Sequence, residues 1–397
     1  MAKCLDHQDL AHFIKPRLRI FLSVDLIGST EYKISHIADQ PTDGSWWPLV
    51  SMLFYTDFQK KFIENWQDFV SSAGAKVSVG PHPKLWKALG DELIFYKECV
   101  NQDEVVAAVQ VWRRTVLDFK ANWLHPELRF KTGGWLVGTP VRNWEVAFAH
   151  DEPDEMDVLL SGQSTAYNFN LLRQYYDPTL TRKIDIDFIG PSMDCGFRIL
   201  GFADERKFVM SADLAYLISA RVGTWNENGF GDQYPAIDFY FLGNQLLKGY
   251  SRSGFDYPVF WLDAFTLCKE SDSVVHANMA DILSPPRQVT SAQVKEALEP
   301  FLKQFGGPPD IPYITTVAVS DGRIKNMMNA ISDDHIEEIN RLRLDYVAMS
   351  GLETSVKESS ASENPGNGDG GVALSGKDVE KAISTLFSSI TALRKKK

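Results

Sequence analysis

The sequence predicts an α+β fold with one large domain followed by a smaller C-terminal part. Strand-like and helix-like stretches alternate between about residues 16 and 263, without the regular strand–helix–strand repetition of a parallel sheet. A chain of 397 residues is too long for one small domain, and its hydrophobic content of 44% is sufficient for a real core. These observations together predict a mixed sheet that helices cover on one face.

The expected elements follow from runs of apolar residues and from their spacing. Residues 18–24 form an apolar run typical of a buried strand, and apolar side chains recur near helical spacing over 49–69. Gly133 and Gly134, inside the strand-like stretch 128–137, indicate a bulge or a close backbone approach. The other expected strands are 92–96, 185–189, 208–210, 237–242 and 257–262. The other expected helices are 102–124, 155–176, 191–202, one from 212, 291–305, 334–349 and 377–393.

Composition divides the chain into five segments. They are an N-terminal segment (1–15), the main domain (16–265), a helical extension (266–354), a linker (355–376) and a last amphipathic helix (377–397). The linker is rich in Ser, Gly, Asn and Asp, which predicts a flexible chain. The last helix ends in four cations at 394–397, which suit a helix C-terminus, although a membrane or nucleic-acid contact is the alternative.

Charge and cysteine usage exclude several classes of protein. The net charge of −11 and a pI near 5.3 argue against a general nucleic-acid binder, which carries a basic surface. The cysteines are scattered, without the spacing of a zinc site or a disulfide framework, and this fits a reducing cytosol. They are Cys4, Cys99, Cys195 and Cys268. Because we see neither a secretory signal nor an apolar run of spanning length, we expect a cytoplasmic protein without a membrane contact.

Two aspartates carry the strongest chemical signal. Asp25 follows the first strand and precedes a glycine turn, and Asp91 lies in a glycine turn before strand 92–96. Carboxylates at the ends of adjacent strands can bind two divalent cations roughly 3.5–4 Å apart, which clamp a displaced phosphate. The backbone N–H groups that could cradle a triphosphate are those of Gly28, Ser29 and Thr30. The pattern indicates phosphoryl chemistry on a nucleotide, whereas the alternative for Asp25 is an ordinary turn or helix-cap aspartate.

Five motifs resemble those of class III nucleotidyl cyclases and occur in that family's order. They lie at 25–30, 87–91, 90–92, 187–198 and 246–249. Any one of them is weak, but the five together are specific and cover roughly two-thirds of the chain, residues 16–265. The resemblance implies a catalytic domain with a ferredoxin-like palm, a mixed sheet with helices, to which the C-terminal helical extension is added.

The resemblance also implies a role for each matched residue. Asp25 and Asp91, with the Leu26 carbonyl, would hold two Mg²⁺ or Mn²⁺ ions. Arg198 would stabilise charge on the α-phosphate, and Asp194 stands where the family usually places the asparagine that positions the ribose. Lys248 would bind the terminal phosphates. The alternatives are an ordinary surface arginine for Arg198 and a loop lysine for Lys248.

Lys87 and Asp187 occupy the family's base-reading positions. A lysine donor and an aspartate acceptor can satisfy adenine, cytosine or uracil, so these two residues leave the base open. The chain is also similar to bacterial pyrimidine cyclases of the Pycsar anti-phage system, in which a tyrosine on the first long helix narrows the pocket. Tyr55 is the candidate for that role, and a core aromatic is its alternative.

Class III catalytic domains work as head-to-tail pairs, so the resemblance implies a homodimer with two composite sites. The expected reaction converts UTP to 3′,5′-cyclic UMP and pyrophosphate, and an effector protein would sense the product in anti-phage defence. CTP is the second choice of substrate, and an adenylyl cyclase is the runner-up. The alternative outside the enzymes is a catalytically dead module for nucleotide binding or dimerisation. A diguanylate cyclase lacks support, because its Gly-Gly-Asp-Glu-Phe run is absent from the sequence.

Overall fold

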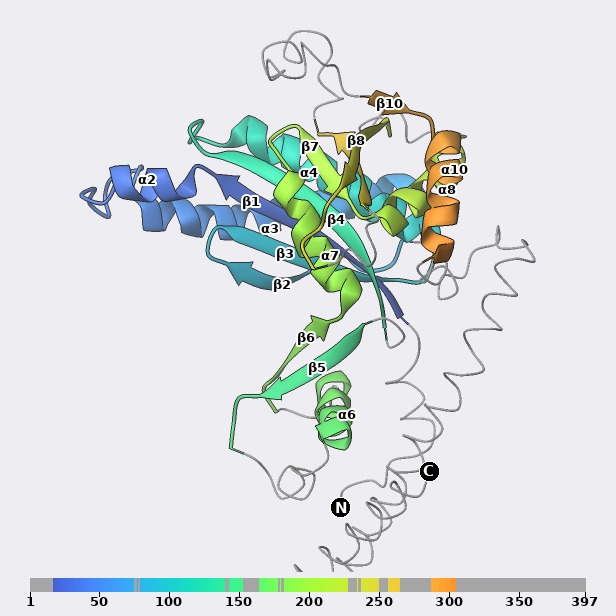
Figure 1. Ribbon diagram of the computed structural model, residues 1–397. Coiled ribbons are helices and arrows are strands. Elements are labelled where there is room, and N and C mark those ends of the chain that lie inside the picture. Colours follow the sequence, from blue (N-terminus) through green and yellow to red (C-terminus); the bar gives the residue numbers. More distant parts are fainter. Residues whose placement is uncertain are drawn as a thin grey trace, which may run out of the picture. The chain divides into compact units, whose positions relative to one another are not determined.

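The structure is a computed structural model (Figure 1). The residues it describes are 17–74, 77, 79–139, 143–152, 164–177, 179, 182–227, 234, 237–249, 256–264 and 287–304. Contacts divide the chain into the units Met1–Leu344 and Asp345–Lys397, and all described residues belong to the first unit. The predicted N-terminal segment, the linker 355–376 and the helices at 334–349 and 377–397 lie outside the described residues.

The first six major elements form a ferredoxin-like palm. In chain order they are β1 (Arg17–Ile27), α3 (Trp47–Ala73), β2 (Lys84–Leu89), β3 (Glu92–Cys99), α4 (Gln102–Asn122) and β4 (Arg129–Thr139). The strands lie in the order β4-β1-β3-β2, and each neighbouring pair is antiparallel. This βαββαβ sequence with its split strand order is the ferredoxin-like arrangement, and it confirms the predicted α+β class.

Four more strands extend this sheet from β4. The sheet has eight strands in the order β10-β8-β9-β7-β4-β1-β3-β2, and it is mixed because β7 runs parallel to β4. The added strands are β7 (Lys207–Met210), β8 (Phe239–Gln245), β9 (Tyr257–Asp263) and β10 (Arg287–Val289). Helices α8 (Ala212–Glu227) and α10 (Ser291–Gln304) pack against each other. A separate two-stranded sheet pairs β5 (Trp144–Ala149) with β6 (Ile184–Ile189) and contacts α6 (Ser164–Tyr176).

Helices cover both faces of the central strands, so the expectation of one covered face is wrong. Helices α3 and α4 lie on one face (Figure 1), where their Phe58 and Trp112 rings contact the Phe95 ring of β3. On the other face α7 (Pro191–Ile199) lies against β4, where the Trp135 indole donates to the Met193 sulfur at 3.5 Å. A Cβ atom at residue 196 would overlap the Trp135 ring, so glycine is what lets α7 pack this closely. This packing holds α7, the helix that carries Asp194 and Arg198, against the sheet.

The close approach predicted at Gly133 is confirmed. A Cβ atom there would lie 2.9 Å from the Val209 side chain on β7. Strands β2, β5 and β10 were not expected as separate elements. β2 has no alternation of buried and exposed residues, and its pairing with β3 is irregular between Leu85 and Lys87. Such a sequence pattern does not predict a strand.

A buried ionic cluster joins the palm to the small sheet. The Arg19 Nη1 atom lies 2.8 Å from Glu145 Oε1, and their side chains are 1% and 5% exposed. Tyr176 of α6 donates its hydroxyl to the other Glu145 oxygen at 2.5 Å. Strand β1, strand β5 and helix α6 therefore meet at one carboxylate. Among the described helices, none combines the length and apolar composition needed to span a bilayer.

Candidate active site

Three acidic side chains gather where β1 ends and β2 turns into β3. They are Asp25, Asp91 and Glu92, which we call the carboxylate cluster. Asp25 lies opposite Glu92 on β3 and opposite Lys131 on β4, and directly paired residues present their side chains on the same face. The turn itself depends on Gly90, whose φ of +70° favours glycine. The Leu26 N–H donates to the Asp91 carbonyl at 3.1 Å and holds the turn against β1.

Burial and mutual repulsion disfavour the ionised form of Asp25 and Glu92 in the carboxylate cluster. Burial raises the pKa of Asp25, the Asp91 charge raises it further, and the Lys131 ammonium, 2.7 Å from Asp25 Oδ2, opposes both effects. Burial likewise raises the pKa of Glu92, and its neighbours Asp25 and Asp91 add to the rise. The Ser23 hydroxyl opposes it by donating to Glu92 at 2.6 Å. A cluster with this excess of negative charge would gain stability from an added cation.

The predicted phosphate turn lies beside the cluster. Gly28 adopts a φ of 89° as the N-cap of α2 (Ser29–Ser35), and it is exposed together with Thr30. The buried Ser29 hydroxyl donates to the Asp91 carboxylate. Ser29 therefore holds the aspartate in place with its side chain, a contact that the sequence did not predict.

Tyr55 lies at the same turn. Its hydroxyl donates to the Gly90 carbonyl, and burial, followed by the Asp91 charge, raises its pKa. In the described part of the chain, no hydrogen bond or ion pair joins Tyr55 to Lys87 or Asp187. Its predicted role in narrowing the base pocket stays a prediction.

The oxygen donors of the cluster suit hard divalent cations such as Mg²⁺ and Mn²⁺. Among the described residues, however, no group of three or more His, Cys, Asp or Glu side chains is arranged to hold a metal. The chain itself would supply Asp25, Asp91 and backbone carbonyls such as that of Leu26. Magnesium commonly completes such a partial set with water and with phosphate oxygens of the substrate. The residues present therefore fit metals that bind together with a nucleotide.

The two base-reading candidates come together although 100 residues separate them in sequence. Lys87 Nζ on β2 lies 2.8 Å from Asp187 Oδ2 on β6, and we call this ion pair the Lys–Asp pair. The ammonium also lies 4.3 Å from the centre of the Trp86 ring. The Trp86 indole donates to the Ile186 carbonyl at 3.0 Å, which holds β6 against β2.

The phosphate-binding candidates meet at α7. Arg198 Nη1 lies 3.9 Å from Asp194 Oδ2, a loose contact one helical turn apart. A Cβ atom at Gly249 would lie 3.5 Å from Arg198 Nη2, so the turn that carries Lys248 lies beside the guanidinium. The structure thus brings Asp194, Arg198 and Lys248 into one region.

These regions share one face of the sheet without direct contact. Lys87 pairs with Ile94, which pairs with Ser23, and Ser23 lies on the same face of β1 as Asp25. Within the described residues, no hydrogen bond or ion pair joins the carboxylate cluster to the Lys–Asp pair or to Arg198.

Sequence reasoning missed Glu92 of the cluster and Lys131, the partner of Asp25. Glu92 was the third letter of a recognised motif, and its adjacency to Asp91 was a usable signal. Lys131 lies inside an expected strand, and its position opposite Asp25 follows only from the register of β4 on β1. A pattern along one strand does not contain that register.

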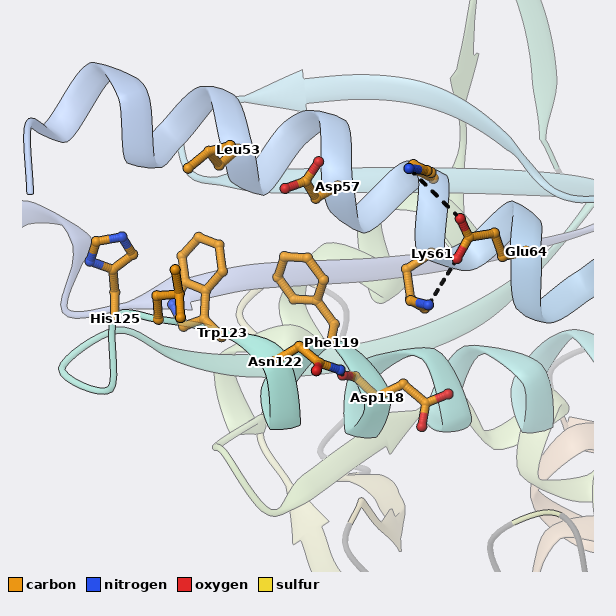
Figure 2. A pocket seen from close by; sticks show the side chains of 11 residues that line it. Leu53, Asp57, Lys61, Glu64, Asp118, Phe119, Asn122, Trp123 and His125 are labelled. Atoms are coloured by element: carbon orange, nitrogen blue, oxygen red, sulfur yellow. Dashed lines mark hydrogen bonds and ion pairs between the residues drawn. The ribbon is translucent and has the colours of Figure 1, made fainter. Parts of the chain in front are cut away.

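A cavity of about 430 Å³ lies between α3 and α4, and it contains no predicted site residue (Figure 2). Its lining residues are Leu53, Asp57, Lys60, Lys61, Glu64, Asp118, Phe119, Asn122, Trp123, Leu124 and His125. Lys61 and Glu64 form an ion pair of 2.8 Å on its wall (Figure 2). The cavity is therefore separate from the candidate active site.

No family model and no curated protein matches this sequence. Several solved structures are similar to it. The adenylyl cyclase CyaB from P. aeruginosa is 12% identical, with 62% of this chain and 94% of that chain covered and a TM-score of 0.34. The guanylate cyclase domain of RhGC from Catenaria anguillulae, in complex with GTP, is 10% identical, with 62% and 96% covered and a TM-score of 0.34. An adenylate cyclase from Trypanosoma brucei is 14% identical, with 64% and 90% covered and a TM-score of 0.34.

Proposed function

We propose that this chain is a nucleotidyl cyclase that converts a pyrimidine nucleoside triphosphate to its 3′,5′-cyclic monophosphate and pyrophosphate. The observation that carries the proposal is the carboxylate cluster. Asp25 and Asp91 stand at the ends of neighbouring central strands, beside a Gly-Ser-Thr turn, in surroundings that favour a cation. The ferredoxin-like palm adds support, because it presents Asp25 on the same sheet face as Lys87 of the Lys–Asp pair.

Each residue then has a chemical task. Asp25 and Asp91 hold two Mn²⁺ or Mg²⁺ ions, which when bound activate the ribose 3′-hydroxyl and neutralise the leaving pyrophosphate. Arg198 stabilises the charge that develops on the α-phosphate during in-line attack. Lys248 binds the terminal phosphates and Asp194 accepts from a ribose hydroxyl.

Base selection rests on the Lys–Asp pair. Lys87 donates to a ring acceptor and Asp187 accepts from the base, a pattern that cytosine and adenine satisfy directly and uracil satisfies with the roles exchanged. With Tyr55 narrowing the pocket, UTP is the first choice and CTP the second. An adenylyl cyclase is the second candidate, because the pair also fits adenine.

A second copy of the chain completes the site in this proposal. One chain supplies the carboxylate cluster, and its partner supplies the Lys–Asp pair, Asp194, Arg198 and Lys248. The lack of contact between these groups among the described residues supports this division. The face of β5–β6 that carries Asp187 also exposes Trp144, Phe148 and Ile189, whose exposed fractions of 38%, 48% and 53% suit a self-association surface.

The deciding experiment incubates the purified protein with Mn²⁺ and an equal mixture of UTP, CTP, ATP and GTP. We expect cyclic UMP or cyclic CMP by mass spectrometry together with equimolar pyrophosphate. Faster conversion of ATP would replace the pyrimidine assignment by an adenylyl cyclase. If none of the four triphosphates releases pyrophosphate, the remaining hypothesis is a catalytically dead nucleotide-binding module. Asp91→Ala should then bind ligand as the wild type does.

Complementation tests the shared site. Asp25→Asn and Arg198→Ala should each be inactive alone. In a 1:1 mixture half of the dimers are mixed and one of their two sites is intact, so roughly one quarter of the wild-type activity should return. A mixture that stays inactive would contradict the composite site.

The biological part of the proposal rests on the resemblance to anti-phage pyrimidine cyclases. We propose a cytoplasmic enzyme whose cyclic nucleotide activates an effector protein during infection. Cells that express the chain should accumulate the cyclic pyrimidine nucleotide after phage challenge, and cells with Asp91→Asn should not.

A further inference from the structure

Lys131 contacts the carboxylate cluster and has no role in the site as proposed so far. It lies on β4 directly opposite Asp25, and its Nζ atom is 2.7 Å from Asp25 Oδ2. The two side chains are 35% and 21% exposed, so the ion pair is partly shielded from water. Its position within the β1–β4 register, which the sheet enforces, makes the contact a built feature of the palm.

The charges around Lys131 are unequal. Lys131, Asp25 and Glu92 form one row across β4, β1 and β3, and Asp91 lies next to this row in the turn. Three carboxylates thus face one ammonium. Among the described residues, Lys131 is the only cation within ion-pair distance of any of the three. A divalent ion arriving at Asp25 therefore meets a lysine that already uses one of its oxygens.

We propose that Lys131 is an internal counter-ion that occupies the cation position at Asp25 in the nucleotide-free protein and leaves it when a divalent cation binds. The inference rests on the proposed function in one respect, namely that Asp25 and Asp91 are metal ligands. Lys131 stabilises the empty site and weakens its affinity for free metal. A metal–nucleotide complex overcomes this competition, because it brings phosphate oxygens as additional ligands and negative charge toward which the released ammonium can turn.

The test measures metal affinity and does not depend on turnover. Nucleotide-free protein is titrated with Mn²⁺, and free Mn²⁺ is followed by electron paramagnetic resonance. Lys131→Met keeps the aliphatic stem and removes the charge, so it should bind Mn²⁺ about tenfold more tightly than wild type. Lys131→Arg keeps the charge and should stay within about twofold of wild type.

Arg129→Met is the matched control. Arg129 lies on the same strand and the same face as Lys131, two residues away, and the substitution removes the same charge. Its ion pair at 3.5 Å is with Glu205 and not with the cluster. It should therefore leave the Mn²⁺ affinity within about twofold of wild type. An equal gain in Arg129→Met would mean a general charge effect and would overturn the specific role of Lys131.

Thermal stability is the second readout, because it reports on the folded state as well as on metal binding. Without metal, Lys131→Met should have a lower melting temperature than wild type, and saturating Mn²⁺ should raise it by more than it raises the wild type. Lys131→Gln keeps a hydrogen-bond donor to Asp25 but removes the charge, so it should also bind Mn²⁺ more tightly than wild type. It replaces the Met variant in the test if that variant does not fold.

The outcomes separate this inference from the proposed function. If Asp25→Asn abolishes Mn²⁺ binding but Lys131→Met binds as wild type does, or more weakly, the counter-ion role is overturned and the metal site stands. If Asp25→Asn leaves Mn²⁺ binding unchanged and no triphosphate releases pyrophosphate, the proposed function itself fails.

Discussion

The carboxylate cluster and the Lys–Asp pair are built in opposite ways. The cluster sets three carboxylates against one lysine at the ends of central strands, and burial raises the pKa of Asp25 and Glu92. The Lys–Asp pair sets one cation against one anion between an edge strand and a small separate sheet. Without an added cation the cluster therefore keeps an excess of negative charge, whereas the two charges of the Lys–Asp pair balance.

This difference separates two kinds of recognition. An unbalanced cluster selects for charge, because any hard cation of suitable size relieves it. A balanced pair selects for a pattern of hydrogen bonds, because a ligand must replace both partners to open it without cost. Metal binding and base selection would then respond to different substitutions.

The largest effect should follow from neutralising the cluster. Asp91→Asn removes a metal-binding charge and should lower the rate of pyrophosphate release by about 10³-fold, with the fold intact. Asp118→Asn is the control, since Asp118 is an acid of α4 whose ion pair at 2.8 Å is with Arg114. A rate within about tenfold of wild type for Asp91→Asn would contradict the metal role of the cluster.

The next effect should come from the buried anchor of the small sheet. Glu145→Ala removes the buried carboxylate that two buried arginines of β1 share and should cost about 3 kcal/mol of the free energy of unfolding, measured by urea denaturation. Because β5 pairs with the strand that carries Asp187, nucleotide binding should weaken while Mn²⁺ binding at the cluster stays the same.

Glu98→Ala is the matched control for that anchor. Glu98 contacts the same two arginines at 3.4 and 3.6 Å, but its side chain is 42% exposed. Removing it should cost less than about 1 kcal/mol. Equal losses for the two variants would show that burial of Glu145 is not what makes the anchor strong.

A smaller and more selective effect should follow from opening the Lys–Asp pair. Asp187→Asn removes the negative charge opposite Lys87 and replaces one acceptor oxygen with a donor, so it should lower kcat/KM for the preferred triphosphate by roughly 10–100-fold. Mn²⁺ affinity without nucleotide should not change. Asp185→Asn, two residues earlier on the same face of β6, is the control, because its partner is His150. A loss of Mn²⁺ affinity in Asp187→Asn would break the separation between the two regions.

The sequence predicted those parts of the site that local pattern encodes. Asp25 and Asp91 each end or begin a strand at a glycine turn, so their approach followed from two local signals. Lys87 and Asp187 lie 100 residues apart, and they were linked only through the family resemblance. Lys131 was missed because cross-strand register is decided by pairing and not by composition.

The same distinction explains the fold. The long helices and apolar strands of the palm were predicted because they carry clear periodicity, whereas their ferredoxin-like arrangement was expected from the family resemblance. The second covered face was not predicted, because it depends on a glycine in α7 meeting Trp135 on a strand far away in sequence. The strand β5 was missed although it carries Glu145, since it has only six residues and a charged residue interrupts its apolar ones.

The smallest effect should come from an ion pair that resembles the Lys–Asp pair but belongs to neither region. Lys61 and Glu64 also meet at 2.8 Å, with side chains 35% and 43% exposed (Figure 2). The Lys61 ammonium, through its hydrogen bond and its charge, lowers the pKa of the Glu64 carboxyl. The folded chain then binds this proton more weakly than the unfolded chain. The contribution to stability is therefore present above the ordinary carboxyl pKa and is lost as the pH falls through the lowered value. Lys61→Met should raise the Glu64 pKa, measured by NMR titration, toward its ordinary value and leave turnover unchanged. A change in turnover would mean that the cavity between α3 and α4 is coupled to the carboxylate cluster, and that the cluster and the Lys–Asp pair do not act alone.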